Sequence, residues 1–121
     1  MINILLPYHD HKMIVVPLIL IILCLFFCPE ENLYIDSNSF SGRLPDRLYN
    51  LESLTLFDGS SNSLSGTLSR DINKLASLTR IFLEDNIFRG AVPSEIVNLE
   101  AIEVITLHYI NFTGNCFYEN V

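Results

Sequence analysis

The chain has 121 residues and a mass of 13.8 kDa, which is room for about one domain of ordinary size. Half of the residues are hydrophobic, yet 14 acidic and 7 basic residues give a formal net charge of -7. This length excludes a protein kinase domain or a doubly wound dehydrogenase, and the lack of a basic stripe argues against nucleic acid as a partner.

Residues 1–12 are predicted to form an N-terminal tail that contains Tyr8-His9-Asp10-His11. Imidazole and carboxylate groups bind metal ions, but two His and one Asp in a flexible tail are weak evidence for such a site. We therefore interpret the cluster as part of a solvated tail and predict no metal site and no cofactor.

Residues 13–28 form an uninterrupted apolar run. As a helix this run would be roughly 24 Å long at about 1.5 Å per residue, and a bilayer core is about 30 Å thick. Because Lys12 precedes the run and Glu30 and Glu31 follow it, the rest of the chain is predicted to be exported. The bulky exit before Pro29 lacks the small residues of a cleavage site. An uncleaved signal anchor and a poorly cleaved signal peptide therefore both remain open, with membrane contact through residues 13–28.

The cysteines give no support to catalysis. Cys24 and Cys28 lie within the apolar run, where they are interpreted as hydrophobic filling, with lipidation as the alternative. Cys116 is the only thiol of the exported part and is either the remnant of a cap cysteine or a free thiol. A nucleophilic cysteine needs a nearby histidine, and no motif supports a pairing of Cys116 with His108. Since phosphate-binding glycine motifs are also absent, the chain is predicted not to be an enzyme.

Residues 29–115 repeat with a period of 24, and residues 116–121 remain as a C-terminal tail. Glycines recur at this spacing, the first three of them follow an asparagine by four residues, and several apolar columns keep the same register. The columns are Gly42/Gly66/Gly90/Gly114, Asn38/Asn62/Asn86, Leu44/Leu68/Val92, Leu48/Ile72/Ile96, Leu51/Leu75/Leu99 and Leu54/Leu78/Ile102. One such unit cannot bury its own apolar face, so stability has to come from stacking on its neighbours.

The register also predicts the local structure of each unit. Three units begin with a short alternating stretch, at 33–35, 81–83 and 105–107, and alternation is typical of a strand with one buried face. The asparagine amide is expected to bond to backbone groups of the turn that follows. We therefore predict a short α/β-type solenoid with parallel strands on the concave face and turns or 3-10 segments on the convex face, preceded by a hydrophobic N-terminal helix.

These columns resemble the leucine-rich repeat, L-x-x-L-x-L-x-x-N-x-L, and the stretches at 38–45, 62–66 and 86–93 resemble its plant-type subclass, N-x-L-S-G-x-I-P. Residues 33–38, residues 44–49, Lys74-Leu75 and His108 are similar to one ectodomain region of phytosulfokine receptors, which are plant cell-surface receptor kinases for a small sulfated peptide. The resemblance implies a protein or peptide ligand, a co-receptor as a further partner, and repeats that face the cell exterior at the plasma membrane or after secretion.

The chain also departs from this pattern. Gly59 stands where a buried Val or Leu belongs, and we expect it to leave a hole beside Phe57 that costs ~2–5 kcal/mol. Ile110 replaces the fourth turn asparagine, and Ser69 replaces a proline. The paired cysteines and tryptophan of the usual plant cap, the kinase domain and the ligand-holding insertion of such receptors are not found in the sequence.

The predicted binding face is the concave sheet, where exposed positions alternate with buried ones. Aromatic rings there are flanked by carboxylates and small hydroxyls, a mixture that favours a basic or amine-bearing partner. A solvated sheet face without a ligand is the alternative. The predicted residues are Tyr34, Asp36, Ser37, Leu56, Asp58, Ser60, Ser61, Arg80, Phe82, Glu84, Asp85, Thr106, His108 and Tyr109.

Asn111-Phe112-Thr113 is an N-x-T sequon, so Asn111 is predicted to be glycosylated if the chain is exported. It belongs to the column of Ser39, Ser63 and Ile87, which is expected to face solvent.

The predicted function is extracellular recognition by a receptor-like protein without a kinase domain. Two alternatives stay open. The first is a truncated gene product with no independent activity, which Gly59, Ile110 and the missing caps favour, and the second is a secreted leucine-rich-repeat inhibitor of an enzyme.

Overall fold

The computed structural model describes residues 31–107, together with the backbone of short strands at 2–3, 8–9, 12–13 and 111–112. The predictions for residues 14–28, for Cys116 and the tail 116–121, and for the Asp10-His11 pair lie outside the described residues, so the hydrophobic helix stays a prediction. Within the described part of the chain, none of the helices has both the length and the apolar content that a bilayer crossing requires.

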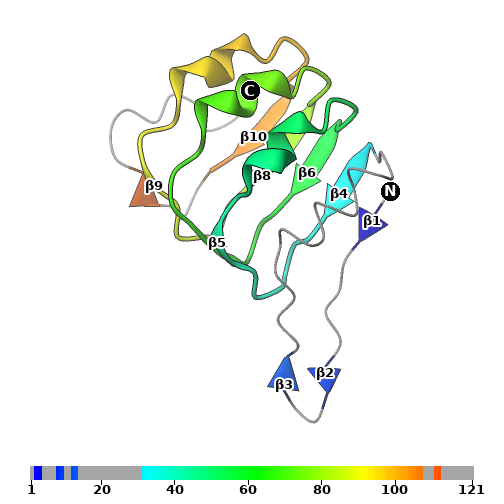
Figure 1. Ribbon diagram of the computed structural model, residues 1–121, viewed down its shortest axis with the longest axis vertical. Coiled ribbons are helices and arrows are strands. Elements are labelled where there is room, and N and C mark those ends of the chain that lie inside the picture. Colours follow the sequence, from blue (N-terminus) through cyan, green and yellow to red (C-terminus); the bar gives the residue numbers. More distant parts are fainter. Residues whose placement is uncertain (1, 4–7, 10–11, 14–30, 108–110, 113–121) are drawn as a thin grey trace.

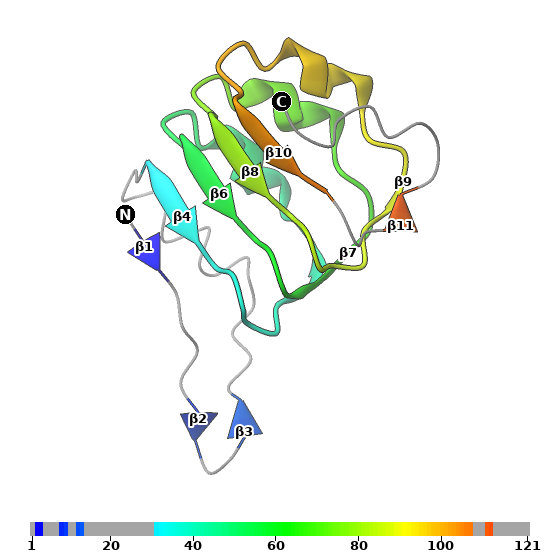
Figure 2. The same cartoon turned by 180° about the vertical axis from the view of Figure 1, so that it is seen from behind.

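A parallel sheet runs through the molecule in the order β1-β4-β6-β8-β10. Its strands are β1 (Ile2–Asn3), β4 (Asn32–Tyr34), β6 (Leu56–Asp58), β8 (Arg80–Phe82) and β10 (Val104–Thr106). Leu33 pairs with Phe57, Phe57 with Ile81, and Ile81 with Ile105, so each step across the four repeat strands is one repeat of 24 residues. The predicted parallel strands and their register are confirmed (Figure 2).

Shorter strands pair after the asparagine turn, at the opposite end of each coil. β5 (Ser41–Arg43) pairs with β7 (Ser63–Ser65), and β9 (Arg89–Gly90) pairs with β11 (Asn111–Phe112), all in parallel. Backbone bonds from Ile87 N to Leu64 O (2.9 Å) and from Arg89 N to Gly66 O (2.9 Å) join the two pairs. The sequence analysis did not predict these strands, because their Ser, Gly and Arg residues have low strand propensity.

The convex side is built from one 3-10 helix per coil: η1 (Asp46–Asn50), η2 (Arg70–Lys74) and η3 (Ser94–Asn98). In Figure 1 these helices lie in front of the strands, and in Figure 2 the open face of the strands is in front. A 3-10 helix is compatible with this position because such helices are usually short. A short helix leaves enough residues for the chain to return to the next strand within a 24-residue coil. The prediction of 3-10 segments on the convex side is confirmed.

The predicted apolar columns fill the space between the strands and the 3-10 helices. Most of their members are fully buried, and Leu51, Val92 and Ile102 are partly buried against the same cluster. The three phenylalanines Phe40, Phe57 and Phe88 are at most 1% exposed and are the largest side chains of this core that are fully buried. One continuous core therefore runs through all described coils, as expected for units that depend on their neighbours.

The hole predicted at Gly59 is not present, and that expectation is wrong. A β-carbon at Gly59 would lie 3.0 Å from Cζ of Phe57 and 3.3 Å from Cδ2 of Leu83, so the Phe57 ring already occupies the space. Other coils fill the same two positions with medium-sized residues, such as Ile81 and Leu83. In this coil the large Phe57 ring therefore takes up space that a second side chain fills in the other coils.

Gly66 shows why the glycine column is needed. Its φ of +78° lies in the left-handed region, which residues with a β-carbon rarely adopt. A β-carbon there would also lie 2.7 Å from Cγ of Arg43, whose side chain crosses over this glycine from the preceding coil. Conformation and close packing therefore both select glycine at this position.

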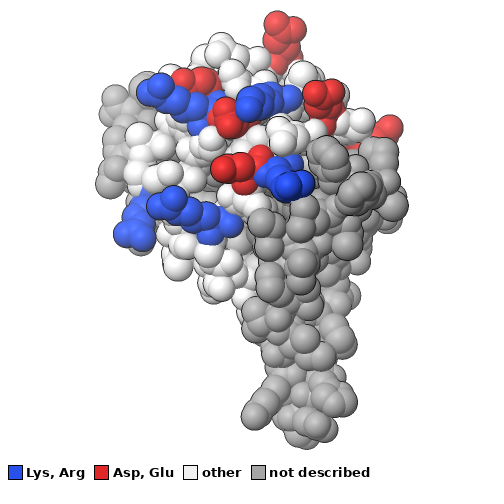
Figure 3. Space-filling view, viewed as in Figure 1, with Lys and Arg blue, Asp and Glu red and all other residues white. Residues whose placement is uncertain are grey.

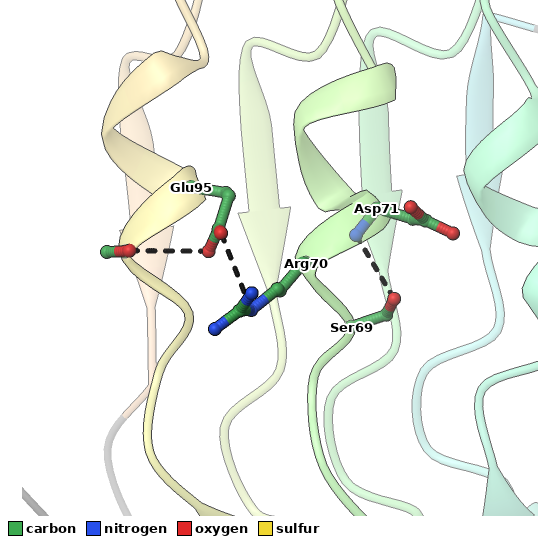
Figure 4. A network of polar contacts seen from close by, with 5 residues as sticks. Ser69, Arg70, Asp71 and Glu95 are labelled. Atoms are coloured by element: carbon green, nitrogen blue, oxygen red, sulfur yellow. Dashed lines mark hydrogen bonds and ion pairs between the residues drawn. The ribbon is translucent and has the colours of Figure 1, made fainter.

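On the convex side, Ser69 and Tyr49 form a contact that a proline at position 69 would prevent. The backbone N–H of Ser69 donates to the hydroxyl of the buried Tyr49 over 3.4 Å, a long and weak bond. The Ser69 Oγ accepts from the N–H of Asp71 (3.1 Å) and so caps η2, as Figure 4 shows. Burial raises the pKa of the Tyr49 hydroxyl, against the lowering effect of the Ser69 bond, and Asp46 and Asp71 raise it further.

Ion pairs on this side are exposed. Arg70 Nε lies 3.5 Å from Glu95 Oε1 and links η2 to η3, and Lys74 Nζ lies 3.3 Å from Asp71 Oδ2 within η2. Figure 4 shows the first pair between neighbouring coils, and Figure 3 shows acidic and basic groups side by side over the 3-10 helices. Such surface pairs contribute ~0–1 kcal/mol each, so the core and the turns dominate stability.

The N-terminal residues contribute strands that the sequence analysis did not predict. β1 pairs in parallel with β4, so that Ile2 lies opposite Leu33 and Asn3 opposite Tyr34. β2 (Tyr8–His9) and β3 (Lys12–Met13) form an antiparallel pair within the predicted tail and at the first residue of the apolar run. The backbone of β1 therefore covers one edge of the sheet, which an unpaired strand would leave open.

Candidate ligand-binding face

The candidate site is the face of the main sheet that points away from the core. In a strand, alternate side chains point to opposite faces, and Leu33, Phe57, Ile81 and Ile105 all point into the core. The next residue of each strand therefore points outward, which gives the row Tyr34, Asp58, Phe82 and Thr106, all partly exposed. The predicted residues Tyr34, Asp58, Phe82 and Thr106 thus lie on the outward face, and their role in binding stays a prediction.

The turn asparagines hold the strands of this face at their carboxyl ends. Asn62 Nδ2 donates to Ile35 O (2.9 Å), Gly59 O (3.2 Å) and Ser60 O (3.1 Å), while its Oδ1 accepts from Phe40 N (3.0 Å). Asn62 thus bonds to backbone groups of its own coil and of the preceding one, and the bonding to the turn is what the sequence predicted for this amide.

Asn86 repeats this arrangement one coil later and is only 6% exposed. Its Nδ2 donates to Gly59 O (2.9 Å), Leu83 O (3.1 Å) and Glu84 O (3.3 Å), and its Oδ1 accepts from Leu64 N (2.9 Å). Ile110, the next residue of the column, lies outside the described residues, and its side chain carries no amide.

The residues before the asparagines turn the chain through a left-handed conformation. Ser37, Ser61 and Asp85 have φ values of 56°, 53° and 56° and are exposed. The backbone N–H of Ser37 donates to Ser60 O (3.0 Å) and that of Ser61 to Glu84 O (3.0 Å). Because the backbone bonds fix these turns, the predicted site residues Ser37 and Asp85 lie at the rim of the concave face.

A hydroxyl group donates to each carboxylate of the concave face. Ser60 Oγ donates to Asp58 Oδ1 (2.6 Å), and Thr106 Oγ1 donates to Glu84 Oε2. The longer contacts of 3.4 Å run from Ser37 Oγ to Asp36 Oδ2 and from Ser61 Oγ to Asp85 Oδ2. These bonds restrict the orientations of the four carboxylates.

Two residues predicted to be exposed are nearly buried. Leu56 and Ser60 each keep only 9% of their surface exposed. Leu56 lies in register between Asn32 and Arg80 on the neighbouring strands, whose side chains are longer or polar. Ser60 donates to Asp58 both from its hydroxyl and from its backbone N–H (3.1 Å), and these two bonds hold its side chain against Asp58. Ser60 therefore orients Asp58 and exposes little surface of its own.

The charge on this face is mostly negative. Asp36, Asp58, Glu84 and Asp85 stand against Arg80, which is exposed. The other basic residues within 31–107 belong to the 3-10 helices and the shorter strands. They are Arg43, Arg47, Arg70, Lys74 and Arg89. The sequence prediction of an acidic face with embedded aromatic rings holds for the residues that the structure describes.

Three predicted residues cannot be placed in full. His108 and Tyr109 lie outside the described residues. Asn111 is described through the backbone of β11, where it lies opposite Arg89, but its side chain is not. In its column, Ser63 and Ile87 are exposed and Ser39 is partly exposed, in agreement with the expected solvent-facing column.

A second polar ladder escaped the sequence analysis. Thr55 Oγ1 donates to Glu31 O (3.0 Å) and Thr79 Oγ1 donates to Thr55 O (2.9 Å), where the strands begin. Thr55 Oγ1 also lies 2.9 Å from Asn32 Oδ1, so its single proton is shared between two acceptors, and the Asn32 amide lies at the edge of the face. The 24-residue spacing of the two threonines was the signal for this ladder. Among residues 31–107, no group of His, Cys, Asp and Glu is arranged as a metal site.

Comparison with known proteins identifies the repeat. Residues 31–51 match the family model described as Leucine Rich Repeat. No curated protein sequence matches the chain.

Solved structures match a larger part. The ectodomain of the plant membrane receptor kinase GASSHO1/SCHENGEN3 from Arabidopsis thaliana, in complex with Casparian strip integrity factor 2, is 34% identical with a TM-score of 0.69 over 71% of this chain and 10% of that chain. The PEPR1–AtPEP1 complex is 33% identical with a TM-score of 0.68, and the match covers 69% of this chain and 12% of that chain. The Arabidopsis receptor kinase HAESA, in complex with the peptide hormone IDA and the co-receptor SERK1, is 30% identical with a TM-score of 0.61. The match covers 65% of this chain and 14% of that chain. The chain thus spans between 10% and 14% of the length of these three receptors.

Proposed function

Because this chain carries leucine-rich repeats and its described part is a short solenoid of that family, we propose that it recognises a protein or peptide ligand outside the cell, as part of a plant receptor-like protein. The observation that carries this proposal is the row Tyr34, Asp58 and Phe82, which places aromatic and charged side chains in register on the concave face. Buried aromatic anchors in a polar surround are the residues that dominate protein interfaces. Structural neighbours that were solved with peptide ligands support the same function.

Selection of ligands from a random 12-residue peptide display library on the full-length chain tests the proposal. The substitutions Tyr34→Ala and Phe82→Ala are expected to weaken the selected peptides by roughly tenfold or more, the loss typical of an aromatic anchor. Val97→Ala is the matched control, because Val97 is an apolar residue of η3 that is 61% exposed on the convex side. A library that yields no specific peptide, or a control that weakens binding equally, contradicts the proposal.

A thermal melt of the same full-length chain is the accompanying measurement. A cooperative transition is expected, because one continuous core joins the described coils. A non-cooperative, aggregating sample would instead support the alternative in which the chain has no independent binding activity.

Export through residues 13–28 is part of the same proposal. The chain should enter the secretory pathway, either anchored at the plasma membrane or released, and should lose this location when residues 13–28 are deleted. Fractionation of plant cells that express tagged chain distinguishes membrane, medium and cytosol. A cytosolic location of the intact chain would contradict export, and release into the medium would favour the secreted inhibitor over an anchored receptor.

Asn111 is proposed to carry a glycan. The solvent exposure of Ser63 and Ile87 in the same column and of Arg89, its register partner, supports an accessible site. Treatment of plant-expressed chain with a peptide glycosidase should lower its mass, and Thr113→Ala should abolish this shift. An unchanged mass in the exported wild-type chain would contradict the proposal.

A further inference from the structure

We propose that Tyr34, Asp58 and Phe82 together bind one basic side chain, lysine or arginine, of the ligand. This inference rests on the proposed function and specifies the chemistry of the partner at one place on the concave face.

The three residues occupy equivalent positions of adjacent strands. Tyr34 pairs with Asp58 and Asp58 pairs with Phe82, in β4, β6 and β8. Since neighbouring strands lie ~4.8 Å apart, the backbones of Tyr34 and Phe82 are separated by about 10 Å with Asp58 midway between them. All three side chains are partly exposed. A carboxylate therefore lies between two aromatic side chains on an accessible surface.

Asp58 is held in a fixed orientation with one oxygen left over. Its Oδ1 accepts from Ser60 Oγ (2.6 Å) and from Ser60 N (3.1 Å). Its Oδ2 makes no hydrogen bond or ion pair with the residues that the structure describes. The nearly buried Ser60 thus prepares Asp58 as an acceptor, and the ligand does not have to supply the energy for that ordering.

The combination selects a cation over other groups. A carboxylate forms its strongest hydrogen bonds with charged donors, and an ammonium or guanidinium group is attracted to the face of an aromatic ring within about 6 Å of its centre.

Neighbouring charges agree with this assignment. Arg80 of β8 is exposed and forms no ion pair with Asp58, and the acids of the face outnumber it. Glu84 is another acceptor of this face, but Thr106 donates to its Oε2, and the residue one repeat before it is Ser60 and not an aromatic residue. The aromatic pair therefore distinguishes Asp58 from the other carboxylates.

Titration of the full-length chain with the short blocked peptide Ac-Gly-Arg-Gly-NH2 tests the inference. The control peptide carries citrulline, which has nearly the shape of arginine without its charge. Amide chemical shifts of residues 34, 58 and 82 are expected to move with the arginine peptide, which should bind about tenfold more tightly than the citrulline peptide. Equal shifts with both peptides would overturn the inference.

Matched variants locate the effect. Asp58→Asn keeps the shape and should weaken the arginine peptide by roughly tenfold, and Phe82→Leu should weaken it by a smaller factor. Glu84→Gln removes a neighbouring charge that does not lie between the two aromatic side chains. It should change the affinity for the arginine peptide by less than about twofold. An equal loss in Asp58→Asn and Glu84→Gln would show attraction by the general charge of the face and would overturn the specific site.

The outcome is separable from that of the proposed function. If display-selected peptides bind the concave face but contain no essential basic residue and tolerate Asp58→Asn, this inference fails and the proposed function stands. If no library peptide binds but binding of the arginine peptide still depends on Asp58, the local site exists and the proposed recognition function fails.

Discussion

Close packing between coils places a strict demand on the turn asparagines and a looser demand on the core residues at positions 57 and 59. Asn38, Asn62 and Asn86 repeat without change, whereas the second coil replaces two medium core residues by Phe57 and Gly59. The amides of Asn62 and Asn86 each meet three carbonyl groups and one N–H in fixed directions. Core volume has no direction, so it admits several solutions.

The largest expected effect comes from breaking the asparagine column at its most buried described member. Asn86→Ala leaves the carbonyls of Leu83 and Glu84 and the N–H of Leu64 without this partner, and should destabilise the chain by roughly 3 kcal/mol. Asn73→Ala, at an exposed position of η2, is the matched control and should change stability by less than about 0.5 kcal/mol. Chemical denaturation measures both, and similar losses would refute the role of the column.

A double-mutant cycle tests the core exchange. Phe57→Ile should cost about 2–3 kcal/mol because it opens a cavity over Gly59, and Gly59→Leu about 1–3 kcal/mol because its β-carbon meets the Phe57 ring. The double variant reproduces the Ile81/Leu83 pattern. Its loss of stability should be smaller than the sum of the two single losses by about 1 kcal/mol or more, because the two residues share one space. Additive losses would mean that the two positions do not compensate each other.

A smaller effect is expected where Ser69 replaces the proline of the other coils. Ser69→Pro removes both the cap of η2 and the N–H that donates to Tyr49, and should cost about 1 kcal/mol. Ser69→Ala keeps the N–H and loses only the cap, so the difference between the two variants measures the Tyr49 contact. If proline were neutral or stabilising, neither contact would matter.

The smallest effect is a pH dependence at Tyr49. Its pKa is raised in the folded chain above the usual value of about 10, so the unfolded chain ionises first as pH rises. The contribution of Tyr49 to stability is therefore complete below pH 10 and declines above it. In melts at rising alkaline pH, Tyr49→Phe should lose stability less steeply than the wild type. Parallel curves would contradict burial of the neutral hydroxyl.

Much of this structure was predictable because the repeat period fixes which residues are equivalent. The columns of Leu48 and Leu54 and the bonding of Asn62 follow from period and residue type alone. Gly59 was misjudged because a column shows the volume of one position and not the ring that a neighbour places there. Leu56 and Ser60 were misjudged because alternation predicts the direction of a side chain and not what lies over it.

The candidate site divides in the same way. Alternation placed Tyr34, Asp58 and Phe82 on the concave face, because the direction of a strand side chain is a local property. That Ser60 orients Asp58, and that one carboxylate oxygen is left for a ligand, depends on distances between side chains that no pattern encodes.

By itself, the sequence determined the solenoid class, the register of the sheet, the turn amides and the acidic, aromatic character of the concave face, because a 24-residue period forces equivalent residues into contact. Only the tertiary structure decided how Phe57 fills the space at Gly59, how Arg43 crosses Gly66, how Ser69 meets Tyr49 and where β1 lies. Each of these is a contact between residues at different positions of the repeat, so its fit depends on three-dimensional packing and not on the period.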